Sequence, residues 1–470
     1  MNVFEGCVPV RLEDVLAERE ARASSQQRLL NTYTCTLVCL TLNIAGEYKA
    51  FPLARRCFQE GIRAMKRALD AEGLMIVHQE STLRTAGYAA YFSVAACPEN
   101  IKTLACDIEA AHPLGRLFDF DVLRPDGRKL SRRDAGGTPR RCFVCGGDAF
   151  VCARSSAHEA AQVSGAMIAI MNTWLRETLS AKITQAAVKA LMAEVATTPK
   201  PGLVDRANNG SHADMDFFSF IDSAAALLPY FQDCALRGFE HDSDAISLFY
   251  SLRPGGRRAD IDMRSATGGV NVHKGIIFSA GLISAAYGHL YRGHADPSPA
   301  EIAAFCKEMT SRLMEDFSGL TAENAKTPGE QLYARYGITG IRGEAASGFA
   351  HVCAHSLPML CRMLKAGHSM NDAGVAALLS LLAVTDDTTI IHRSDIATLR
   401  RIQKQTADFL SSDPSMETII HMAQETDASF IEKNISAGGC ADLLAITWFF
   451  YYLNQRHPVN DPVFHRRLRS

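Results

Sequence analysis

Hydrophobic and polar positions divide the chain into a shorter part with mixed strand and helix patterns and a longer, almost wholly helical part. In the shorter part, residues 36–44, 74–77 and 90–94 carry the apolar and β-branched runs of short strands. Residues 57–69 and 100–108 instead repeat large apolar side chains at helical spacing. This mixture predicts an N-terminal domain of the α/β or α+β class.

One strand of this part has polar residues of possible chemical importance. Asp119 and Asp121 alternate with large apolar residues between positions 117 and 123, and Pro-Asp-Gly at 125–127 predicts a hairpin turn. Both carboxylates then project from one face, about 7 Å apart at the backbone. Such a pair suits Mg²⁺ together with substrate phosphates. A solvated strand face is the alternative interpretation.

After His158 the pattern becomes helical. Small and apolar residues dominate up to Ala196, and no proline occurs before Pro199. Glycine-rich or polar stretches interrupt the later helices at residues 199–216, 264–275, 340–349, 385–393 and 434–442. A mainly α-helical second domain is therefore predicted. Its boundary falls within or between helices near residue 178, which gives domains 1–177 and 178–470.

Composition and charge exclude several classes of protein. Of the 470 residues, 47% are hydrophobic and 21% are charged, so the chain can bury large cores. The formal net charge of −2 lacks the basic excess that drives binding to nucleic acid or anionic membrane. The N-terminal pattern is not that of a signal peptide, and no apolar run approaches the roughly 20 residues of a membrane helix. We expect a cytoplasmic protein.

Basic residues cluster around the predicted hairpin. Residues 116–141 contain eight of them against four acidic residues. The eight are Arg116, Arg124, Arg128, Lys129, Arg132, Arg133, Arg140 and Arg141. Paired arginines suit a triphosphate, although a basic hairpin that faces solvent is an equally simple explanation.

Cys142, Cys145, Cys152 and His158 form the one dense group among fourteen cysteines. Three thiols and an imidazole are ligands that structural Zn²⁺ takes, and the first C-x2-C spacing fits a zinc site. The later spacings are looser than usual, so buried reduced cysteine is the alternative. A thioredoxin-like role is disfavoured, because the C-x2-C does not open a helix after a strand.

The interruptions of the helical part concentrate charge and glycine. Residues 198–216 combine prolines and glycines with Lys, Arg, His and Asp, which favours a binding loop. Residues 264–275 lead into an apolar helix, so their amides and Lys274 are candidates for phosphate binding without a Walker pattern. The other stretches add carboxylates that can converge on a metal. Plain surface loops and solvated helix caps are the alternatives.

The N-terminal motifs resemble a known family. They are His-Pro-Leu-Gly-Arg-Leu-Phe-Asp-Phe-Asp-Val at 112–122, Leu-Ser-Arg-Arg-Asp at 130–134, Pro-Arg-Arg-Cys at 139–142 and Val-Cys-Ala-Arg at 151–154. Over roughly residues 10–175 the chain resembles the citrate lyase holo-acyl-carrier-protein synthase family, also called apo-citrate lyase phosphoribosyl-dephospho-CoA transferase. This implies transfer of a phosphoribosyl-dephospho-CoA group to a serine of the citrate lyase acyl carrier protein, the gamma subunit, with release of pyrophosphate.

The residues already singled out fit that reaction and a nucleotidyltransferase-like domain. Asp119 and Asp121 are assigned to Mg²⁺, and His112 is a candidate base for the serine hydroxyl. Contacts with the triphosphate are assigned to Arg116, Arg132 and Arg133.

The interruptions of the helical part, taken together, resemble a second family. They read Thr-Pro-Lys-Pro-Gly-Leu-Val-Asp-Arg at 198–206, Asn-Asn-Gly-Ser-His-Ala-Asp-Met-Asp at 208–216, Arg-Ser-Ala-Thr-Gly-Gly-Val-Asn-Val-His-Lys-Gly at 264–275, Arg-Gly-Glu-Ala-Ala-Ser-Gly-Phe at 342–349, Asp-Asp-Thr-Thr at 386–389 and Ser-Ala-Gly-Gly-Cys-Ala-Asp at 436–442. Over roughly residues 180–455 the chain is similar to triphosphoribosyl-dephospho-CoA synthases. These helical enzymes convert ATP and dephospho-CoA into 2′-(5″-triphosphoribosyl)-3′-dephospho-CoA and adenine.

The second resemblance implies roles for individual residues. Carboxylate roles fall to Asp205, Asp214, Glu344 and Asp387, of which Glu344 or Asp205 is the candidate base. Triphosphate binding, together with Mg²⁺, falls to Lys200, Arg206, His212, Gly268, Gly269, Asn271, His273, Lys274, Gly438 and Gly439. Thr389 and Cys440 depart from the family pattern, which has Asn and Ser there, and this puts fine positioning in doubt rather than the reaction class.

The sequence therefore predicts a bifunctional enzyme in which one domain makes the substrate of the other. Two alternatives remain open at this stage. The N-terminal domain could be a zinc-stabilised module that only docks the carrier protein, or the client could be malonate decarboxylase, which carries a similar prosthetic group.

Overall fold

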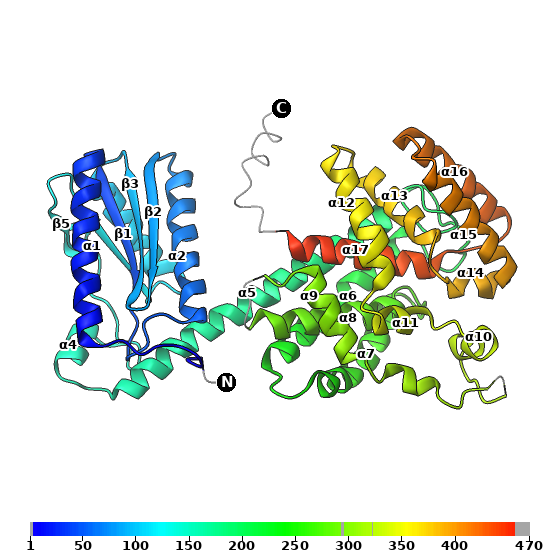
Figure 1. Cartoon of the computed structure of the whole chain (residues 1–470), viewed down its shortest axis with the longest axis horizontal. Coiled ribbons are helices and arrows are strands. Elements are labelled where there is room, and N and C mark those ends of the chain that lie inside the picture. Colours follow the sequence, from blue (N-terminus) through cyan, green and yellow to red (C-terminus); the bar gives the residue numbers. More distant parts are fainter. Residues whose placement is uncertain (1–2, 293–295, 322, 456–470) are drawn as a thin grey trace. The chain divides into compact units, whose positions relative to one another are not determined.

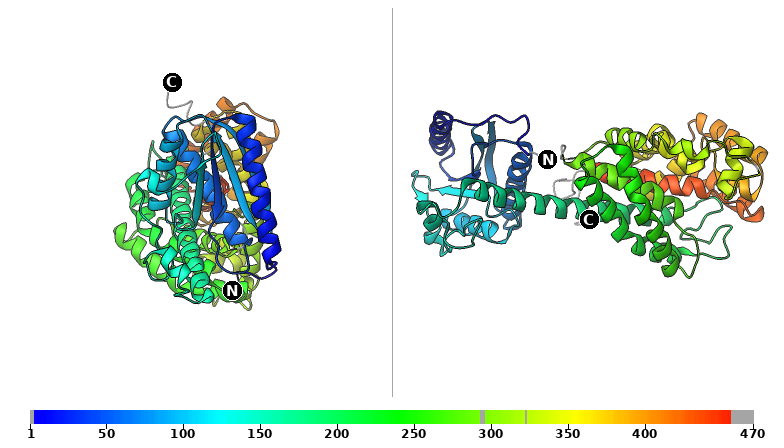
Figure 2. Two further views of the ribbon diagram at one scale, coloured as in Figure 1. Left: turned by 90° about the vertical axis from the view of Figure 1, so that its left-hand side faces the viewer. Right: turned by 90° about the horizontal axis from the view of Figure 1, so that it is seen from below.

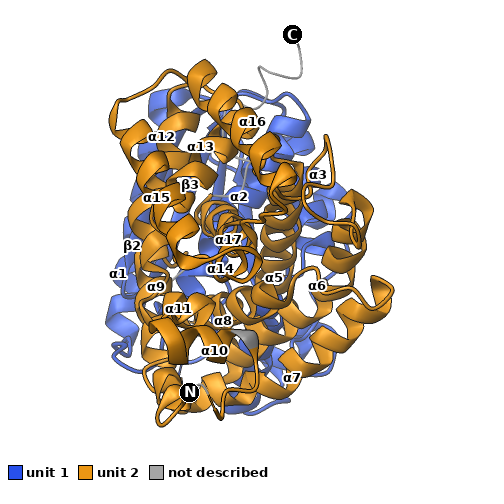
Figure 3. Cartoon of the chain, turned by 90° about the vertical axis from the view of Figure 1, so that its right-hand side faces the viewer, with its two compact units in different colours: residues 1–177 blue, residues 178–470 orange. Residues whose placement is uncertain are grey.

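The computed structural model describes residues 3–292, 296–321 and 323–455, so the end of the predicted range 178–470 lies outside it. The chain divides into two compact units, residues 1–177 and 178–470 (Figure 3). Helix α5 (Ala160–Ala196) continues through the boundary without a break. Within the described ranges, no helix is both long and apolar enough to cross a bilayer.

The first unit has a five-stranded sheet with helices on both faces (Figures 1 and 2). Its elements are α1 (Leu12–Tyr33), β1 (Thr36–Leu42), α2 (Pro52–Ala71), β2 (Ile76–Arg84), β3 (Gly87–Val94), α3 (Pro98–Ala111), β4 (Phe118–Leu123), β5 (Lys129–Leu130), the 3-10 turn η1 (Arg133–Ala135) and α4 (Ala149–Arg154). The strand order is β2-β3-β1-β4-β5, and every neighbouring pair is antiparallel. The unit is therefore α+β. The α/β alternative is wrong, because tight turns join β2 to β3 and β4 to β5, and such turns make strands antiparallel.

Alternation along the strands separates two layers of side chains. Leu40 and Phe118 face α2, where Gly61 leaves room for both of them. Cys39 lies on the opposite face and packs with Leu29 of α1. Asp119 and Asp121 of β4 point to this α1 side, because their register partners Thr41 and Cys39 do.

The described part of the second unit is helical. Its elements are the end of α5, α6 (Phe217–Glu240), α7 (Ala245–Ala266), α8 (Lys274–Tyr291), α9 (Pro299–Met309), η2 (Leu313–Phe317), α10 (Pro328–Tyr336), α11 (Gly340–Ala346), η3 (Val352–Ser356), α12 (Leu357–Lys365), α13 (Met370–Leu382), α14 (Thr388–Arg393), α15 (Ile396–Ser411), α16 (Met416–Glu432) and α17 (Gly438–Asn454). Most residues of α8, α13 and α17 are buried, so these helices form the core. The predicted mainly helical domain is confirmed, although α11 and α14 occupy two of the expected interruptions.

Candidate functional sites

The loop between α5 and α6, residues 197–216, is shaped by its own polar groups. Asp205 is buried, and its carboxylate accepts hydrogen bonds from the backbone amides of Lys200 (3.0 Å), Ala207 (2.6 Å) and Asn208 (3.1 Å). These bonds fix the turn that carries Lys200. Asp205 therefore positions the loop and lies outside the walls of the cavities described below.

A cavity of about 230 Å³, here called the Lys200 cavity, lies between this loop and the N-terminal ends of α8 and α17. Its walls include the sequence-predicted residues Lys200, His212, Asn271, His273, Lys274 and Gly438. Lys200 and Glu194 are both almost completely buried and form an ion pair. Burial raises the pKa of Glu194, whereas the ammonium of Lys200 acts in the opposite direction.

Two histidines of the Lys200 cavity have lowered pKa values. His273 is buried, and desolvation together with the charge of Lys200 lowers its pKa to about 3. Its Nδ1 shares a 2.7 Å hydrogen bond with the hydroxyl of Ser223, and its buried Nε2 has no partner. Burial, with the charge of Arg393, also lowers the pKa of His212. The imidazole of His273 can therefore offer a hydrogen bond to a ligand without adding charge. Both ring nitrogens of His212 are engaged, Nε2 with the hydroxyl of Ser436 (2.9 Å) and Nδ1 with Arg393 (3.3 Å).

A second cavity of about 370 Å³, the Glu344 cavity, adjoins the first and includes Glu344, Asp387 and Gly439 in its walls. Glu344 Oε1 lies 2.5 Å from His351 Nδ1, and this carboxylate raises the pKa of His351. The other oxygen, Oε2, is buried and has no hydrogen-bond partner. Glu344 thus has one oxygen available for a ligand.

Asp387 joins the N-terminal ends of α14 and α17. Its Oδ1 accepts hydrogen bonds from the amides of Thr389 (2.8 Å) and Ile390 (3.2 Å), and its Oδ2 accepts one from the amide of Cys440 (2.8 Å). Because Thr389 and Cys440 donate through the backbone, their departures from the family pattern leave these bonds intact.

Asp442 belongs to the walls of both cavities, yet the sequence analysis gave it no role. Burial raises the pKa of Asp442 well above its usual range, and Glu194 and Asp387 add to this effect. Its carboxylate lies against Gly275 in the first turn of α8, where a Cβ would approach Asp442 Oδ2 to 1.9 Å. Two features of the sequence could have identified this carboxylate. Asp442 ends the 436–442 motif, and its neighbour Glu194 is the lone acidic residue in the apolar C-terminal part of α5.

Besides Asp205, four predicted residues of this unit lie outside both cavity walls. Arg206 donates a hydrogen bond to Asn371 Oδ1 (2.8 Å). The Asp214 side chain is 64% exposed and lies 3.9 Å from His212 Nδ1. Gly268 and Gly269 form an exposed turn with positive φ angles before α8.

In the first unit, a cavity of about 330 Å³, the Asp119 cavity, opens on the α1 face of the sheet. Asp119 forms a 2.6 Å ion pair there with Arg140. The other cations in its walls are Arg19 and Arg22 of α1 and Lys49. The sequence analysis did not identify these three residues. The only feature of the sequence that could have indicated them is the spacing of Arg19 and Arg22, which places both on one face of a helix. Asp121 pairs with Lys129 (2.6 Å) and lies outside the cavity wall.

The remaining predicted residues of this unit are dispersed. Arg132 pairs with the buried Glu109, the guanidinium of Arg116 stacks 4.8 Å from the ring of Phe143, and Arg133 is exposed. His112 lies on the other face of the sheet from Asp119. There its ring contacts Phe118, and its Nε2 is 3.5 Å from Glu60 Oε1.

The cysteine cluster comes together as a compact group. One ligand atom from each of Cys142, Cys145, Cys152 and His158 lies within 4.8 Å of all the others. The Sγ atoms of Cys145 and Cys152 are 3.5 Å apart, near the roughly 3.8 Å expected between tetrahedral thiolates on zinc. The Nε2 of His158 is buried without a partner. The donor set therefore fits a tetrahedral metal ion.

Comparison with known proteins assigns a family to each unit of the chain. Residues 180–461 match the family described as ATP:dephospho-CoA triphosphoribosyl transferase, and residues 10–174 match the family described as apo-citrate lyase phosphoribosyl-dephospho-CoA transferase. The 2-(5''-triphosphoribosyl)-3'-dephosphocoenzyme-A synthase of Pectobacterium atrosepticum is 42% identical over 57% of this chain and 88% of its own length.

Two relatives match almost the whole chain. Protein CitXG of Haemophilus influenzae is 34% identical over 94% of this chain and 96% of its own length. Protein CitXG of Leuconostoc mesenteroides subsp. cremoris is 31% identical over 96% and 98%, respectively. Both predicted resemblances are thus confirmed, in the predicted order. The chain belongs to the CitXG family, in which an apo-citrate lyase phosphoribosyl-dephospho-CoA transferase domain precedes an ATP:dephospho-CoA triphosphoribosyl transferase domain.

Proposed function

We propose that this protein makes and attaches the prosthetic group of citrate lyase. The helical unit converts ATP and 3′-dephospho-CoA into 2′-(5″-triphosphoribosyl)-3′-dephospho-CoA and adenine. The N-terminal unit, with nucleotidyltransferase-type chemistry, transfers the phosphoribosyl-dephospho-CoA group to a serine of the acyl carrier protein, the gamma subunit, and releases pyrophosphate. The presence of both family matches in one chain carries this proposal, because the product of one unit is the substrate of the other.

The two alternatives are not favoured. A unit that only docks the carrier protein disagrees with the match of residues 10–174 to a transferase family. Malonate decarboxylase as client disagrees with the citrate lyase named in that family's description. We place both reactions in the cytoplasm, where reducing conditions keep the cysteines as thiols.

The reaction of the helical unit is a glycosyl transfer. The 2′-hydroxyl of dephospho-CoA forms a bond to C1′ of the ATP ribose while the bond from C1′ to adenine breaks. A base removes the hydroxyl proton, and an acid protonates the departing adenine. Glu344 suits the base, because its Oε2 is buried without a partner. Asp442 suits the acid, because burial raises its pKa and it faces both cavities.

The other carboxylates of this unit act through position. Backbone amides donate hydrogen bonds to the carboxylates of Asp205 and Asp387. Asp205 therefore holds the loop 197–216 in place, and Asp387 holds the N-terminal ends of α14 and α17. Asp214 is near enough to His212 to orient it.

The ATP triphosphate is assigned to the Lys200 cavity. Lys200 and Lys274 supply charge there, and the neutral His273 supplies a hydrogen bond through its unpartnered Nε2. Gly438, at the start of α17, adds a helix N-terminus. Mg²⁺ bound with ATP would neutralise phosphate charge, and the carboxylates of both cavities are oxygen donors of the type it prefers.

In the N-terminal unit, the carrier serine attacks the phosphorus atom bound to the ribose, and the bond to pyrophosphate breaks. Arg19, Arg22, Lys49 and Arg140 suit the phosphates in the Asp119 cavity. Asp119 and Asp121 lie on the same face of β4, and each forms an ion pair with a basic side chain. Their carboxylates therefore fit Mg²⁺. That ion would supply charge neutralisation for the leaving pyrophosphate. The position of His112 on the opposite face gives no support to its role as base.

We further propose that the cysteine cluster holds structural Zn²⁺. The purified protein is expected to contain about one zinc per chain by elemental mass spectrometry, and Cys145→Ser should remove most of it, because serine is a poor ligand. Cys97→Ser is the matched control, since Cys97 is an exposed thiol outside the cluster. Full zinc content in the Cys145 variant, or none in the wild type, would contradict the assignment.

The overall function is tested by mass spectrometry of the citrate lyase acyl carrier protein after incubation with this protein, ATP, dephospho-CoA and Mg²⁺. We expect a mass gain that corresponds to phosphoribosyl-dephospho-CoA, with adenine and pyrophosphate released. Adenine release with an unmodified carrier would leave only the helical unit as an enzyme. No adenine release at all would overturn the proposal for that unit.

A further inference from the structure

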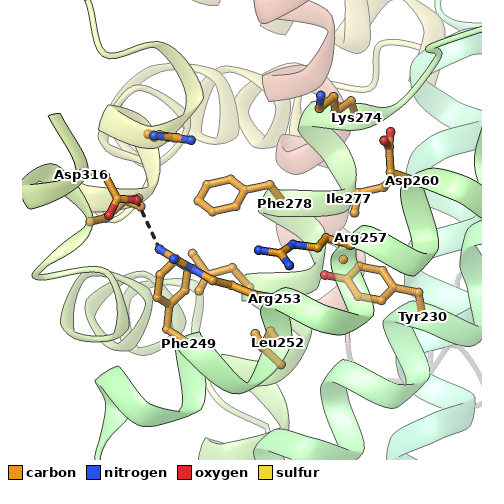
Figure 4. A pocket seen from close by; sticks show the side chains of 14 residues that line it. Tyr230, Phe249, Leu252, Arg253, Arg257, Asp260, Lys274, Ile277, Phe278 and Asp316 are labelled. Atoms are coloured by element: carbon orange, nitrogen blue, oxygen red, sulfur yellow. Dashed lines mark hydrogen bonds and ion pairs between the residues drawn. The ribbon is translucent and has the colours of Figure 1, made fainter. Parts of the chain in front are cut away.

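A further cavity of about 490 Å³ lies beside the proposed reaction site, and none of the proposed reactions uses it. We call it the Arg257 cavity. It is formed by α7 and α8, with contributions from Tyr230 of α6 and Asp316 of η2 (Figure 4). Arg342 of α11 also belongs to its wall. Lys274 belongs to its wall and also to the wall of the Lys200 cavity. Lys274 is therefore within reach of a ligand in either cavity.

The Arg257 cavity has an excess of positive charge. Its two carboxylates are already paired, Asp316 with Arg253 (3.2 Å) and Asp260 with Arg264 (3.4 Å). Within the described ranges, Arg257, Arg342 and Lys274 form no ion pair with a carboxylate. In Figure 4 the guanidinium of Arg257 points into the middle of the cavity. Three cations without an ion-pair partner around one cavity favour an anionic ligand.

The rest of the wall is apolar. It consists mainly of Phe249, Leu252, Ile277, Phe278, Leu282 and Leu313. Inorganic phosphate or a triphosphate alone would gain nothing from this surface. A ligand with an anionic centre and a long uncharged arm would use both parts of the wall, and the volume is within the roughly 300–1,000 Å³ of small-molecule sites.

We propose that the Arg257 cavity binds the diphosphate and pantetheine arm of 3′-dephospho-CoA, an assignment that rests on the proposed function. Of the two substrates, only dephospho-CoA has both a diphosphate and a long uncharged arm. The carboxylates of the Lys200 and Glu344 cavities suit a triphosphate that carries Mg²⁺, whereas arginines suit a diphosphate without metal. Lys274 then stands where the two substrates meet.

Steady-state kinetics of adenine release by the full chain test the assignment. Arg257→Ala is expected to raise KM for dephospho-CoA about 10-fold and to leave KM for ATP within about twofold, because one charged hydrogen bond to the diphosphate is lost. Arg257 is exposed and unpaired, so this change should not disturb folding. Arg258→Ala is the matched control, because the neighbouring Arg258 is paired with Asp262 and lies outside the cavity wall.

The outcomes separate the possible occupants. A rise in KM for ATP instead would assign the cavity to the triphosphate, and unchanged values for both substrates would show that neither uses it. Each result overturns the proposal.

Calorimetric binding of 4′-phosphopantetheine, which has the arm and a phosphate but no adenosine, provides a readout without turnover. Binding to the wild type that weakens about 10-fold in Arg257→Ala supports the cavity assignment even if adenine release fails. Equal binding to both proteins, or none to the wild type, contradicts it.

Discussion

Asp442→Asn is expected to lower the rate of adenine release by about 10²–10⁴-fold, the usual contribution of a positioned general acid. The substitution keeps the shape of the side chain next to Gly275 and removes only the proton that the carboxyl group can give to adenine. Because burial raises the pKa of Asp442, the acid form persists to higher pH than in an exposed carboxyl group. The decline in the wild-type rate at alkaline pH that follows its deprotonation should be absent in the variant. Adenine release across a pH series measures both effects.

Asp386→Asn is the matched control for this experiment. Asp386 lines the Glu344 cavity like Asp442, but its carboxylate is committed to an ion pair with Arg400 (2.5 Å). We expect its rate to stay within a few-fold of the wild type. A rate for Asp442→Asn similar to that of the control would remove Asp442 from the role of acid, and Glu344→Gln would then be compared in the same assay.

Local sequence patterns were sufficient for elements whose partners are close in the chain. The alternation of β4 and the turn at 125–127 predict a hairpin, and the structure has one. The short β5 leaves part of the β4 edge open, however. There Glu109 accepts a hydrogen bond from the Phe120 amide (2.8 Å), and Lys102 donates one to the Phe120 carbonyl (2.9 Å). These contacts depend on the packing of α3 and cannot be deduced from periodicity.

The candidate sites also separate what local sequence patterns predict from what depends on the tertiary fold. The motif spacing placed Lys200, His273 and Glu344 in loops and helix ends that do converge on adjoining cavities. It assigned a role to Asp205, whose oxygens accept hydrogen bonds from its own loop, and gave none to Asp442, whose carboxylate faces the cavities. That difference arises from backbone amides that approach one carboxylate and not the other, which is decided only by the tertiary fold.

Asp119→Asn is expected to lower carrier loading by about 10²–10³-fold, similar to the removal of one strong electrostatic contact in an active site. Asp119 lies in the wall of the Asp119 cavity, where it pairs with Arg140 and, by our proposal, binds Mg²⁺. Glu18, the other carboxylate of this wall, pairs with Arg84. Adenine release by the same preparation should be unchanged, because the helical unit contains its own reaction site. Mass spectrometry of the carrier and quantitation of adenine in one reaction mixture give both values.

Two further variants make the result specific to the metal proposal. Asp126→Asn removes a carboxylate from the exposed turn of the same hairpin, where Asp126 pairs with Arg128 (2.7 Å), and it should load the carrier normally. Asp121→Asn should lose activity if both carboxylates hold Mg²⁺, with a higher Mg²⁺ concentration needed for the residual rate. Normal loading by Asp121→Asn would restrict the metal to Asp119 and its cavity. Normal loading by Asp119→Asn would refute the assignment, because no other carboxylate of β4 lines the described cavity.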